Sequence, residues 1–358
     1  MKIIHTGDIH IGAPLKNLSA DKALRRKTEI LDGFCKLCAY AKDTGVRAVV
    51  LAGDLFDANS VSNALRSQVF SAIENAKPVC FFYVFGNHDQ SISLAGAPDN
   101  LYTFSKNGEW KTYDLGENVT ITGLHASYFS AQAFDTLSLS VQAFNLLVLH
   151  GDIYKNTSSA FIPLSAFQTK PVDYLALGHI HQPTARAERL GVRGVYRYCG
   201  CLEGMGFDEI GARGFFLLEI ENGRIIAEKF LSFATRTVWE TRVDISACKN
   251  YLEVENAVLT SLKEIQSKDM VKVVLTGSFC AGLRKDVSLL ADRLNDKFFF
   301  ARVEDTSRLA FSYQDYEKDY TERGAFVREV LRTNLSQEQK ESVLEVGLKA
   351  LLGEEIDL

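Results

Sequence analysis

The sequence predicts an α/β protein whose main domain is followed by a small α+β domain and C-terminal helices. Three observations carry this prediction. Short apolar, β-rich runs alternate with helical stretches over the first half of the chain. A strand–helix alternation restarts near residue 238, and two amphipathic helical patterns follow from about residue 322. The length of 358 residues leaves room for two folded domains.

The first half of the chain predicts parallel strands joined by helices. In chain order, we expect strand 2–7, helix 19–44, strand 46–53, helix 60–76 and strand 79–85. The helices are long enough to cross over a sheet, so the strands can run parallel. Residues 90–117 predict a long loop with a short helix. Further strands are expected at 118–124, 145–150 and 173–178.

The pattern becomes antiparallel from about residue 193 to residue 233. Phe215–Glu221 and Arg224–Phe233 flank Asn222-Gly223, which is a strong hairpin signal. The small domain is then expected to contain Val238–Ile245, Tyr251–Ser267, Val271–Gly277, Lys285–Asn295 and Phe298–Val303, as alternating strands and helices. A polar spacer follows from about residue 312, and helices are expected at 322–332 and 337–352.

Composition and charge limit the classes of function. The formal net charge of −5 argues against nucleic-acid binding through overall charge, although a local basic strip could form from Lys22, Arg25, Arg26 and Lys27. No apolar run approaches membrane-spanning length, and no signal peptide precedes the first strand, so no membrane partner is expected. The odd count of seven cysteines is typical of a reducing cytoplasm, where we expect the protein.

Residues that commonly bind metals follow five of the predicted strands. The motifs are H-T-G-D-I-H at 5–10, G-D-L-F-D at 53–57, G-N-H-D at 86–89, V-L-H-G-D at 148–152 and G-H-I-H at 178–181. Open α/β sheets bind their ligands at the carboxyl ends of strands. Six of the seven histidines lie at strand ends, which a scatter of core histidines would not produce. Asp54 could bridge two ions held by the other residues, which predicts a two-metal hydrolase.

The mixture of donors constrains the metal and the substrate. Imidazole, carboxylate and amide ligands suit Mn²⁺, Fe or Zn²⁺ rather than Ca²⁺. Asp8 and His10 are two residues apart, so both would point to one side of an extended strand, and His179 and His181 repeat this spacing. Two doubly charged cations fit a substrate with negative charge at its reacting centre, and phosphate esters are the obvious class.

This ordered set of motifs resembles the calcineurin-like metallophosphoesterases. The opening H-T-G-D-I-H-I-G, together with G-D-L-F-D, resembles their DNA-repair exonuclease branch, which includes SbcD-like and YhaO-like enzymes. Gly200–Gly214 resembles the segment that closes the nuclease domain of that branch, except that the branch carries an Arg where this chain has Met205-Gly206-Phe207. The implied fold is a four-layer metallophosphoesterase sandwich of two mixed β-sheets flanked by helices, with a small α+β cap domain and C-terminal helices.

The resemblance also implies a role for each motif residue. The ligands of one divalent ion would be Asp8, His10, Asp54 and His181. The ligands of the second would be Asp54, Asn87, His150 and His179, so that Asp54 bridges the two ions. His88 would not bind metal but would stabilise or protonate the scissile phosphate, and Asp89 would orient its ring. Two Mn²⁺ ions are the expected cofactor, with Fe or Zn²⁺ as alternatives.

The implied organisation has three parts. A metallophosphoesterase nuclease domain would span residues 1–235, a DNA-engaging α+β cap 236–310, and a linker with partner-docking helices 311–358. The implied function is metal-dependent DNA exonuclease and endonuclease activity in double-strand break repair. The implied partner is an SMC-like ATPase, and the protein could also form a homodimer. The alternatives are a small-molecule phosphodiesterase or phosphatase, and a partner-binding scaffold. The C-terminal helices could instead fold back on the cap.

Two histidines lie outside the expected ligand set. His5 is expected to pack inside its strand. His125 follows the strand expected at 118–124, where it has either a structural role or a place in the lining of the cleft.

Overall fold

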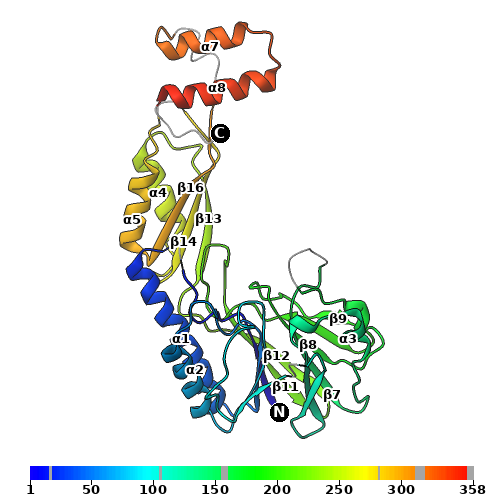
Figure 1. Ribbon diagram of the computed structural model, residues 1–358. Helices are drawn as coiled ribbons and strands as arrows, with labels where there is room; N and C mark the ends of the chain where they lie inside the picture. The colour runs from blue at the N-terminus through cyan, green and yellow to red at the C-terminus, as the bar shows by residue number, and fades with distance from the viewer. Residues whose placement is uncertain (16–17, 105–106, 155–159, 281–282, 311–318, 353–358) are drawn as a thin grey trace. The chain divides into compact units, whose positions relative to one another are not determined.

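The computed structural model describes the chain except for residues 16–17, 105–106, 155–159, 281–282, 311–318 and 353–358. The chain forms two compact units, unit 1 over Met1–Val238 and unit 2 over Trp239–Leu358. Two mixed six-stranded sheets build unit 1 (Figure 1). Among the described residues, no helix is both long and apolar enough to cross a membrane.

The first sheet of unit 1 has the strand order β12–β11–β1–β2–β3–β4. Its strands are β1 (Lys2–Thr6), β2 (Ala48–Ala52), β3 (Cys80–Val84), β4 (Leu101–Thr103), β11 (Gly214–Glu221) and β12 (Arg224–Ser232). β1 to β4 run parallel, and β11 pairs antiparallel with both β1 and β12. The helices α1 (Ala20–Asp43) and α2 (Asn63–Asn75) make the crossovers, so β1, β2 and β3 end at the same edge.

The second sheet has the strand order β5–β6–β7–β8–β10–β9. Its strands are β5 (Lys111–Asp114), β6 (Val119–Gly123), β7 (Phe144–His150), β8 (Tyr174–Gly178), β9 (Glu188–Leu190) and β10 (Gly194–Tyr198). The four central strands run parallel, and β5 and β9 pair antiparallel at the two edges. The strands β7 and β8 therefore also end at a common edge.

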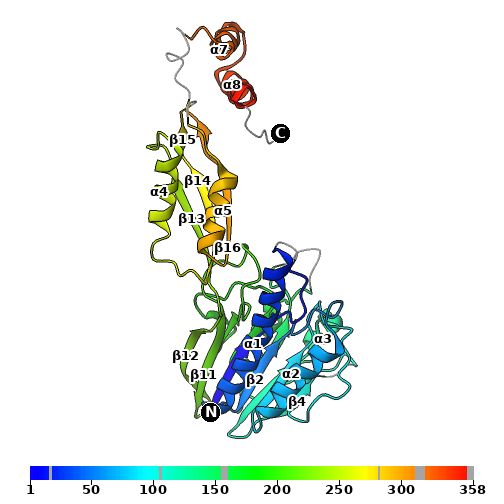
Figure 2. The same ribbon diagram turned by 90° about the vertical axis from the view of Figure 1, so that its left-hand side faces the viewer.

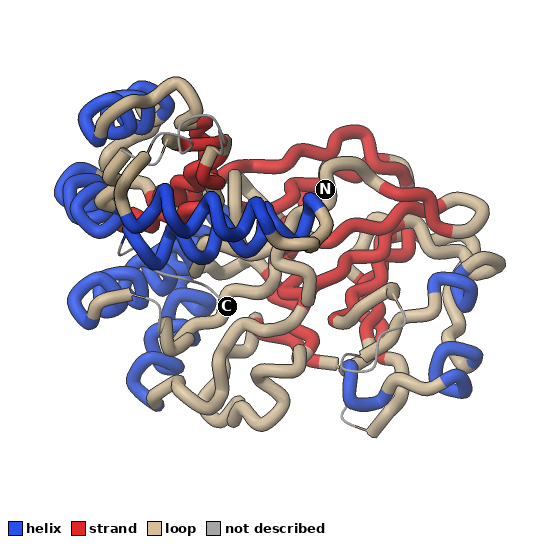
Figure 3. Tube along the Cα trace, turned by 90° about the horizontal axis from the view of Figure 1, so that it is seen from above, coloured by secondary structure: helices blue, strands red, loops and turns tan. Residues whose placement is uncertain are grey.

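Unit 1 is a sandwich of four layers. Facing side chains such as Ile3 and Val148 form the core between the two sheets. On the outer face of the first sheet, α1 packs through residues such as Phe34, and Figure 2 shows α1 and α2 side by side there. On the outer face of the second sheet, Phe134 of α3 (Ala131–Asp135) packs against Phe167. Figure 3 distinguishes helices and strands along the same chain by colour. The predicted sandwich of two mixed sheets flanked by helices is confirmed.

Local sequence accounts for where these elements begin and end. The Ser62 side chain accepts a hydrogen bond from the Leu65 N–H at 3.2 Å and so caps the start of α2. Gly45, with a φ of 67°, follows α1 and allows the left-handed turn that ends it. Asn222 and Gly223 have φ values of 50° and 69°, as the tight hairpin between β11 and β12 requires.

Two parts of the sequence prediction are wrong. The stretch 90–117 contains the short strands β4 and β5 instead of a loop with a helix in its described residues. These strands have three and four residues, too few to show a clear alternation of apolar and polar side chains. β10 lies in the region expected to be antiparallel, yet it pairs parallel to β8 after β9 has reversed the chain.

Unit 2 is an α+β unit with a sheet of strand order β13–β14–β16. Its larger elements are β13 (Val238–Asp244), α4 (Tyr251–Ser261), β14 (Met270–Thr276), α5 (Val287–Lys297) and β16 (Phe300–Asp305). Figure 2 shows α4 and α5 on one face of this sheet. The short strands β15 (Ser278–Phe279) and β17 (Arg308–Leu309) form a separate pair.

Two helices, α7 (Glu322–Arg332) and α8 (Gln337–Leu352), follow in unit 2 and begin and end where the sequence predicts. They pack closely, because a Cβ on Gly347 would lie 2.1 Å from Cζ of Phe326. Their buried residues belong to the same apolar cluster as the sheet, namely Val327, Val330, Leu344 and Leu348. This pair of helices therefore contributes to the buried core of unit 2.

Candidate metal centre

The side chains expected to bind metal converge where strands of the two sheets end. The first sheet supplies Asp8 and His10 after β1, Asp54 after β2, and Asn87 and His88 after β3. The second sheet supplies His150 at the end of β7, and His179 and His181 after β8. Contacts between the two sets cross from one sheet to the other, so the structure brings together residues separated by up to 173 positions, as in Asp8 and His181.

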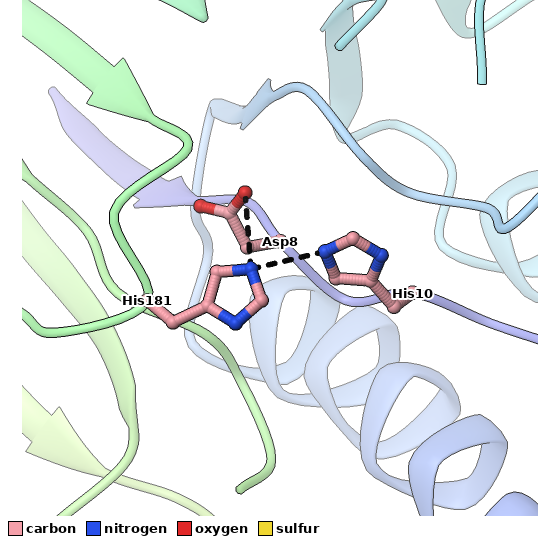
Figure 4. Close-up of side chains that lie close together, drawn as sticks. All are labelled: Asp8, His10 and His181. Carbon is pink, nitrogen blue, oxygen red and sulfur yellow. Dashed lines mark hydrogen bonds and ion pairs between the residues drawn. The ribbon is translucent and has the colours of Figure 1, made fainter. Parts of the chain in front are cut away.

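A first group consists of Asp8, His10 and His181 (Figure 4). The Nε2 atoms of His10 and His181 lie 3.1 Å apart, and Nε2 of His181 lies 4.0 Å from Oδ1 of Asp8. One donor atom from each of the three residues lies within 4.8 Å of the others. Two imidazole nitrogens that face each other beside a carboxylate form a donor set that suits a divalent transition-metal ion.

Asp54 lies between this group and a second one. Its Oδ2 atom is 3.7 Å from Nε2 of His10 and 3.4 Å from Nε2 of His150. Its Oδ1 atom accepts a hydrogen bond from the backbone N–H of His88 at 2.8 Å. The carboxylate is thus held in place by the backbone and reaches imidazoles from both sheets, which is the geometry of a bridging ligand.

The second group surrounds the amide oxygen of Asn87. This Oδ1 atom lies 3.0 Å from Nε2 of His150 and 3.3 Å from Nδ1 of His179. Nδ1 of His150 donates to the carbonyl of Ala52 at 2.9 Å, so this ring is oriented by the backbone and directs Nε2 toward the group. Asp8, Asp54 and His150 also offer donor atoms within 4.8 Å of one another.

Four of these residues have positive φ angles, a backbone conformation that residues other than glycine rarely adopt. The φ angles are 48° at Asp8, 51° at His10, 48° at Asp54 and 103° at His179. Such conformations cost about 1–3 kcal/mol each and concentrate at functional sites. The expectation that Asp8 and His10 extend a strand is wrong, because β1 ends at Thr6 and both residues lie in the irregular segment that follows it.

Glycines in the motifs make room for the side chains that are expected to bind metal. A Cβ on Gly86 would lie 2.1 Å from Oδ1 of Asp54. A Cβ on Gly53 would lie 2.1 Å from Nδ1 of the His150 ring, and Gly53 has a φ of 92°. These close approaches explain why the G-D and G-N-H-D motifs begin with glycine.

The electrostatics of the centre favour a bound cation. Burial raises the pKa of Asp8 to about 6. Burial also opposes ionisation of Asp54, but the hydrogen bond with His150, the charges of His150 and His10 and the His88 N–H together outweigh it and lower the pKa of Asp54 to about 2. For His150, burial is outweighed by Asp54 and Asp8, which raise its pKa to about 9. The two carboxylates therefore stabilise positive charge between the sheets, as a divalent ion would require.

His88 lies at the exposed side of the centre. Its side chain is 48% exposed, and its ring centroid lies 4.9 Å from that of His10. The nearby carboxylate is Asp57, whose Oδ2 atom is 3.9 Å from Nδ1 of His88. An exposed imidazole beside a metal-binding group can transfer a proton to a bound substrate.

Asp89 does not orient His88, contrary to the sequence expectation. Its side chain is fully buried. Its Oδ1 atom accepts from the Gly86 N–H at 2.7 Å, and its Oδ2 atom accepts from the Leu55 N–H at 2.9 Å and from the Tyr83 hydroxyl. Asp89 therefore fixes the turns after β2 and β3, and with them the backbone that carries Asp54 and Asn87.

Sequence reasoning missed two residues of the centre. Asp57 is the second acid of G-D-L-F-D and could have been noticed there as a partner for His88. Glu209 accepts a hydrogen bond from Nδ1 of His181. Glu209 lies inside Gly200–Gly214. The sequence shows an acidic residue there but does not show that it lies near a histidine in the fold.

The two remaining histidines are buried and hydrogen-bonded, and His125 also lines a small pocket together with Phe85 and Tyr128. Nδ1 of His5 lies 3.0 Å from the hydroxyl of Tyr174, and its Nε2 lies 3.2 Å from the carbonyl of Leu177, so this buried ring joins the two sheets. His125 accepts from the Phe85 N–H at 2.9 Å and lies 3.1 Å from the carbonyl of Phe104. The expectation that His5 packs inside its strand is confirmed.

Comparison with known proteins agrees with this geometry. The family model of the calcineurin-like phosphoesterases matches residues 1–183, which is just over half of the 358 residues. The uncharacterized metallophosphoesterase YhaO of Bacillus subtilis is 26% identical over 307 residues, which cover 78% of this chain and 72% of YhaO.

Two further relatives have names that refer to DNA or to nuclease activity. The DNA double-strand break repair protein Mre11 of Methanopyrus kandleri is 26% identical over 264 residues, covering 64% of this chain and 56% of Mre11. SbcD, a component of the nuclease SbcCD of Escherichia coli, is 27% identical over 278 residues, covering 63% of this chain and 66% of SbcD. The family expected from the motifs is confirmed: the chain belongs to the calcineurin-like phosphoesterases and is a metal-dependent phosphoesterase.

Proposed function

We propose that this protein is a two-metal phosphodiesterase that hydrolyses DNA. The observation that carries the proposal is the convergence of Asp8, His10, Asp54, Asn87, His150, His179 and His181 from the ends of five strands. These residues would hold two divalent ions, with Asp54 shared between them. Imidazole, carboxylate and amide donors together favour Mn²⁺, with Fe or Zn²⁺ as alternatives.

When bound, the two ions would lower the pKa of a nucleophilic water and neutralise charge on the phosphoryl group. The protein's own contribution is to place groups around the substrate. Asp54 is fixed through the His88 N–H, so its oxygens remain directed at both groups of imidazoles. His88 would donate a hydrogen bond or a proton to the substrate phosphate from the exposed side, with the Asp57 carboxylate 3.9 Å behind its Nδ1 atom.

DNA as the substrate is supported by the relatives rather than by charge. Mre11 is named as a double-strand break repair protein, and SbcD as part of a nuclease. A role in double-strand break repair is proposed on this basis. The competing function is hydrolysis of a small phosphodiester or phosphate monoester. It is favoured by the net charge of −5 and by the burial of Arg26, which lies inside the only basic strip that the sequence suggested.

Paired substrates separate these two functions. Full-length protein supplied with Mn²⁺ would be given linear duplex DNA and, in parallel, bis(4-nitrophenyl) phosphate. We expect hydrolysis of both, with cleavage of the DNA at its ends and internally. Hydrolysis of the small ester alone would support the small-molecule enzyme, and hydrolysis of neither would leave only the partner-binding scaffold.

We further propose that unit 2 engages the DNA and that α7 and α8 dock an SMC-like ATPase. SbcD is named as one component of a complex, which supports a partner for this chain. On α8, the side chains of Val343 and Val346 are 41% and 39% exposed, and grooves of partner proteins commonly bind such apolar helix positions. In the alternative, these helices only pack against the core of unit 2. The burial of Leu344 and Leu348 supports this alternative. A homodimer stays a further prediction.

All seven cysteines are free thiols. Free thiols persist in a reducing compartment, and we therefore propose a cytoplasmic location.

A further inference from the structure

The His181 ring has a partner at each of its two nitrogens. Its Nε2 atom faces the metal-binding group, at 3.1 Å from Nε2 of His10. Its Nδ1 atom, on the opposite side of the ring, donates to Oε1 of Glu209. A neutral imidazole carries only one N–H, so a carboxylate at Nδ1 draws the proton there and leaves the lone pair on Nε2.

Glu209 is itself held firmly. Its side chain is 5% exposed, and its Oε2 atom accepts a hydrogen bond from the backbone N–H of Met205. The same segment also binds the backbone of the histidine, because the Cys201 N–H donates to the carbonyl of His181 at 3.1 Å. Both the ring and the main chain of His181 are thus fixed by residues 201–209.

A buried ion pair anchors this segment to α1. Nη2 of Arg26 donates to the carbonyl of Gly204 at 2.7 Å and to Oε2 of Glu203 at 3.1 Å. Oε1 of Glu203 accepts from the Thr235 N–H at 2.7 Å. The turn that carries Glu209 therefore has little freedom to move away from His181, and Glu203 is a second buried glutamate in this segment whose carboxylate binds elsewhere.

We propose that Glu209 is a positioning residue that fixes the tautomer and the orientation of His181 for metal binding. This inference rests on the proposed metal-dependent function. Partners of this kind raise the basicity of a metal-binding histidine, and their loss typically lowers metal affinity by about 10- to 100-fold. Because Glu209 acts on a residue of the first group, only one of the two ions should be affected strongly.

Calorimetric titration of the metal-free full-length protein with Mn²⁺ tests the proposal. Wild type should bind two ions per chain. Glu209→Ala should bind one of them about 10- to 100-fold more weakly and the other with nearly unchanged affinity. Glu209→Gln should show a smaller loss, because its amide oxygen can still accept from Nδ1 of His181. Glu203→Gln is the matched control. Its amide oxygen can still accept a hydrogen bond and keep the segment anchored, so it should lower the unfolding temperature but leave both affinities as in wild type.

Three results would overturn the proposal. The first is wild-type affinity for both ions in Glu209→Ala, which would leave the proposed phosphodiesterase untouched. The second is an equal loss in Glu203→Gln and Glu209→Gln, which would assign Glu209 a purely structural role. The third is the absence of Mn²⁺ binding by wild type, which would also remove the proposed function. Circular dichroism checks the fold of each variant, and if Glu209→Ala does not fold, the comparison of the two Gln variants decides.

Discussion

Asp54 and His88 are neighbours in the metal centre with opposite surroundings. Asp54 is buried, and its Oδ2 atom lies within 3.7 Å of imidazole nitrogens from both sheets. His88 is 48% exposed and lies beside the ring of His10. A buried, shared carboxylate is suited to hold metal, whereas an exposed imidazole is suited to exchange protons with a substrate.

Substitution of these two residues should therefore separate metal binding from turnover. His88→Ala should keep both ions and lower the rate of bis(4-nitrophenyl) phosphate hydrolysis by about 10²- to 10⁴-fold, the usual contribution of a general acid. Asp54→Asn should lose both metal and hydrolysis. Mass spectrometry of the metal content, with the rate measured on the same samples, checks this. Equal metal loss in the two variants would show that His88 is a ligand.

His5 should make the stability of the protein depend on pH. Burial lowers its pKa from about 6.5 to about 3. As the pH falls between these values, the unfolded chain binds a proton at His5 that the folded chain does not, so the folded state loses stability. His5→Phe has no histidine to protonate and so avoids this loss of stability. It also leaves the Tyr174 hydroxyl without its partner, which lowers the free energy of unfolding by about 1–3 kcal/mol.

The free energy of unfolding of His5→Phe should therefore lie further below that of wild type near neutral pH, and the difference should shrink as the pH falls toward about 5. Urea unfolding of both proteins without metal, at the two pH values, measures it. A deficit that stays constant would mean that His5 is not kept neutral by burial.

At this scale the sequence identified the candidate metal ligands because each motif places them beside glycine at the end of an apolar run. It did not reveal that Asp89 binds Leu55 and Gly86, or that Glu209 binds His181. These contacts depend on distances between segments up to 34 residues apart, and such distances are set only by the folded chain.

At the scale of the elements, α1 carries a buried arginine, Arg26, which the sequence alone did not distinguish from the surface arginine beside it. Arg26 is fully buried and pairs with Glu29 at 2.7 Å and with Glu203 at 3.1 Å. Its neighbour Arg25 is 67% exposed and pairs with the same Glu29 at 3.2 Å. Removal of one partner from a buried ion pair leaves an uncompensated charge inside the protein.

Arg26→Gln should lower the free energy of unfolding by about 3–5 kcal/mol, as is usual when a buried ion pair is broken. Arg25→Gln on the same helix should change it by less than about 1 kcal/mol, because exposed pairs contribute little. Urea unfolding of both variants under identical conditions measures the difference. Similar values for the two would show that the Arg26 pairs contribute no more than surface charge.

Elements with strong periodicity were predictable, and short edge strands were not. The patterns of α7 and α8 extend over 11 and 16 residues, and the predicted ends agree with the structure. β4 has only three residues, each half-buried, and β5 is mostly exposed, so neither carries the apolar pattern of a core strand. The parallel pairing of β10 depends on its neighbour β8, which no local pattern specifies.

At the scale of the whole molecule, the exposed apolar side chains of α8 are the candidate docking surface for a partner. The double variant Val343→Glu with Val346→Glu changes only exposed positions and leaves the buried Leu344 and Leu348 in place. If α8 docks the ATPase, the variant should lose co-purification with it and keep hydrolysis of bis(4-nitrophenyl) phosphate. Ser342→Glu, also exposed on α8, serves as the charge control. Undiminished co-purification of the double variant would place the docking surface elsewhere.

The central claim is that two metal ions, held between the ends of the two sheets, make this protein a phosphodiesterase. Its most direct test is to titrate the metal-free full-length protein with Mn²⁺ while following bis(4-nitrophenyl) phosphate hydrolysis. The account predicts almost no hydrolysis without metal and full activity only when two ions per chain are bound. Hydrolysis by the metal-free protein, or full activity with one ion per chain, would contradict it.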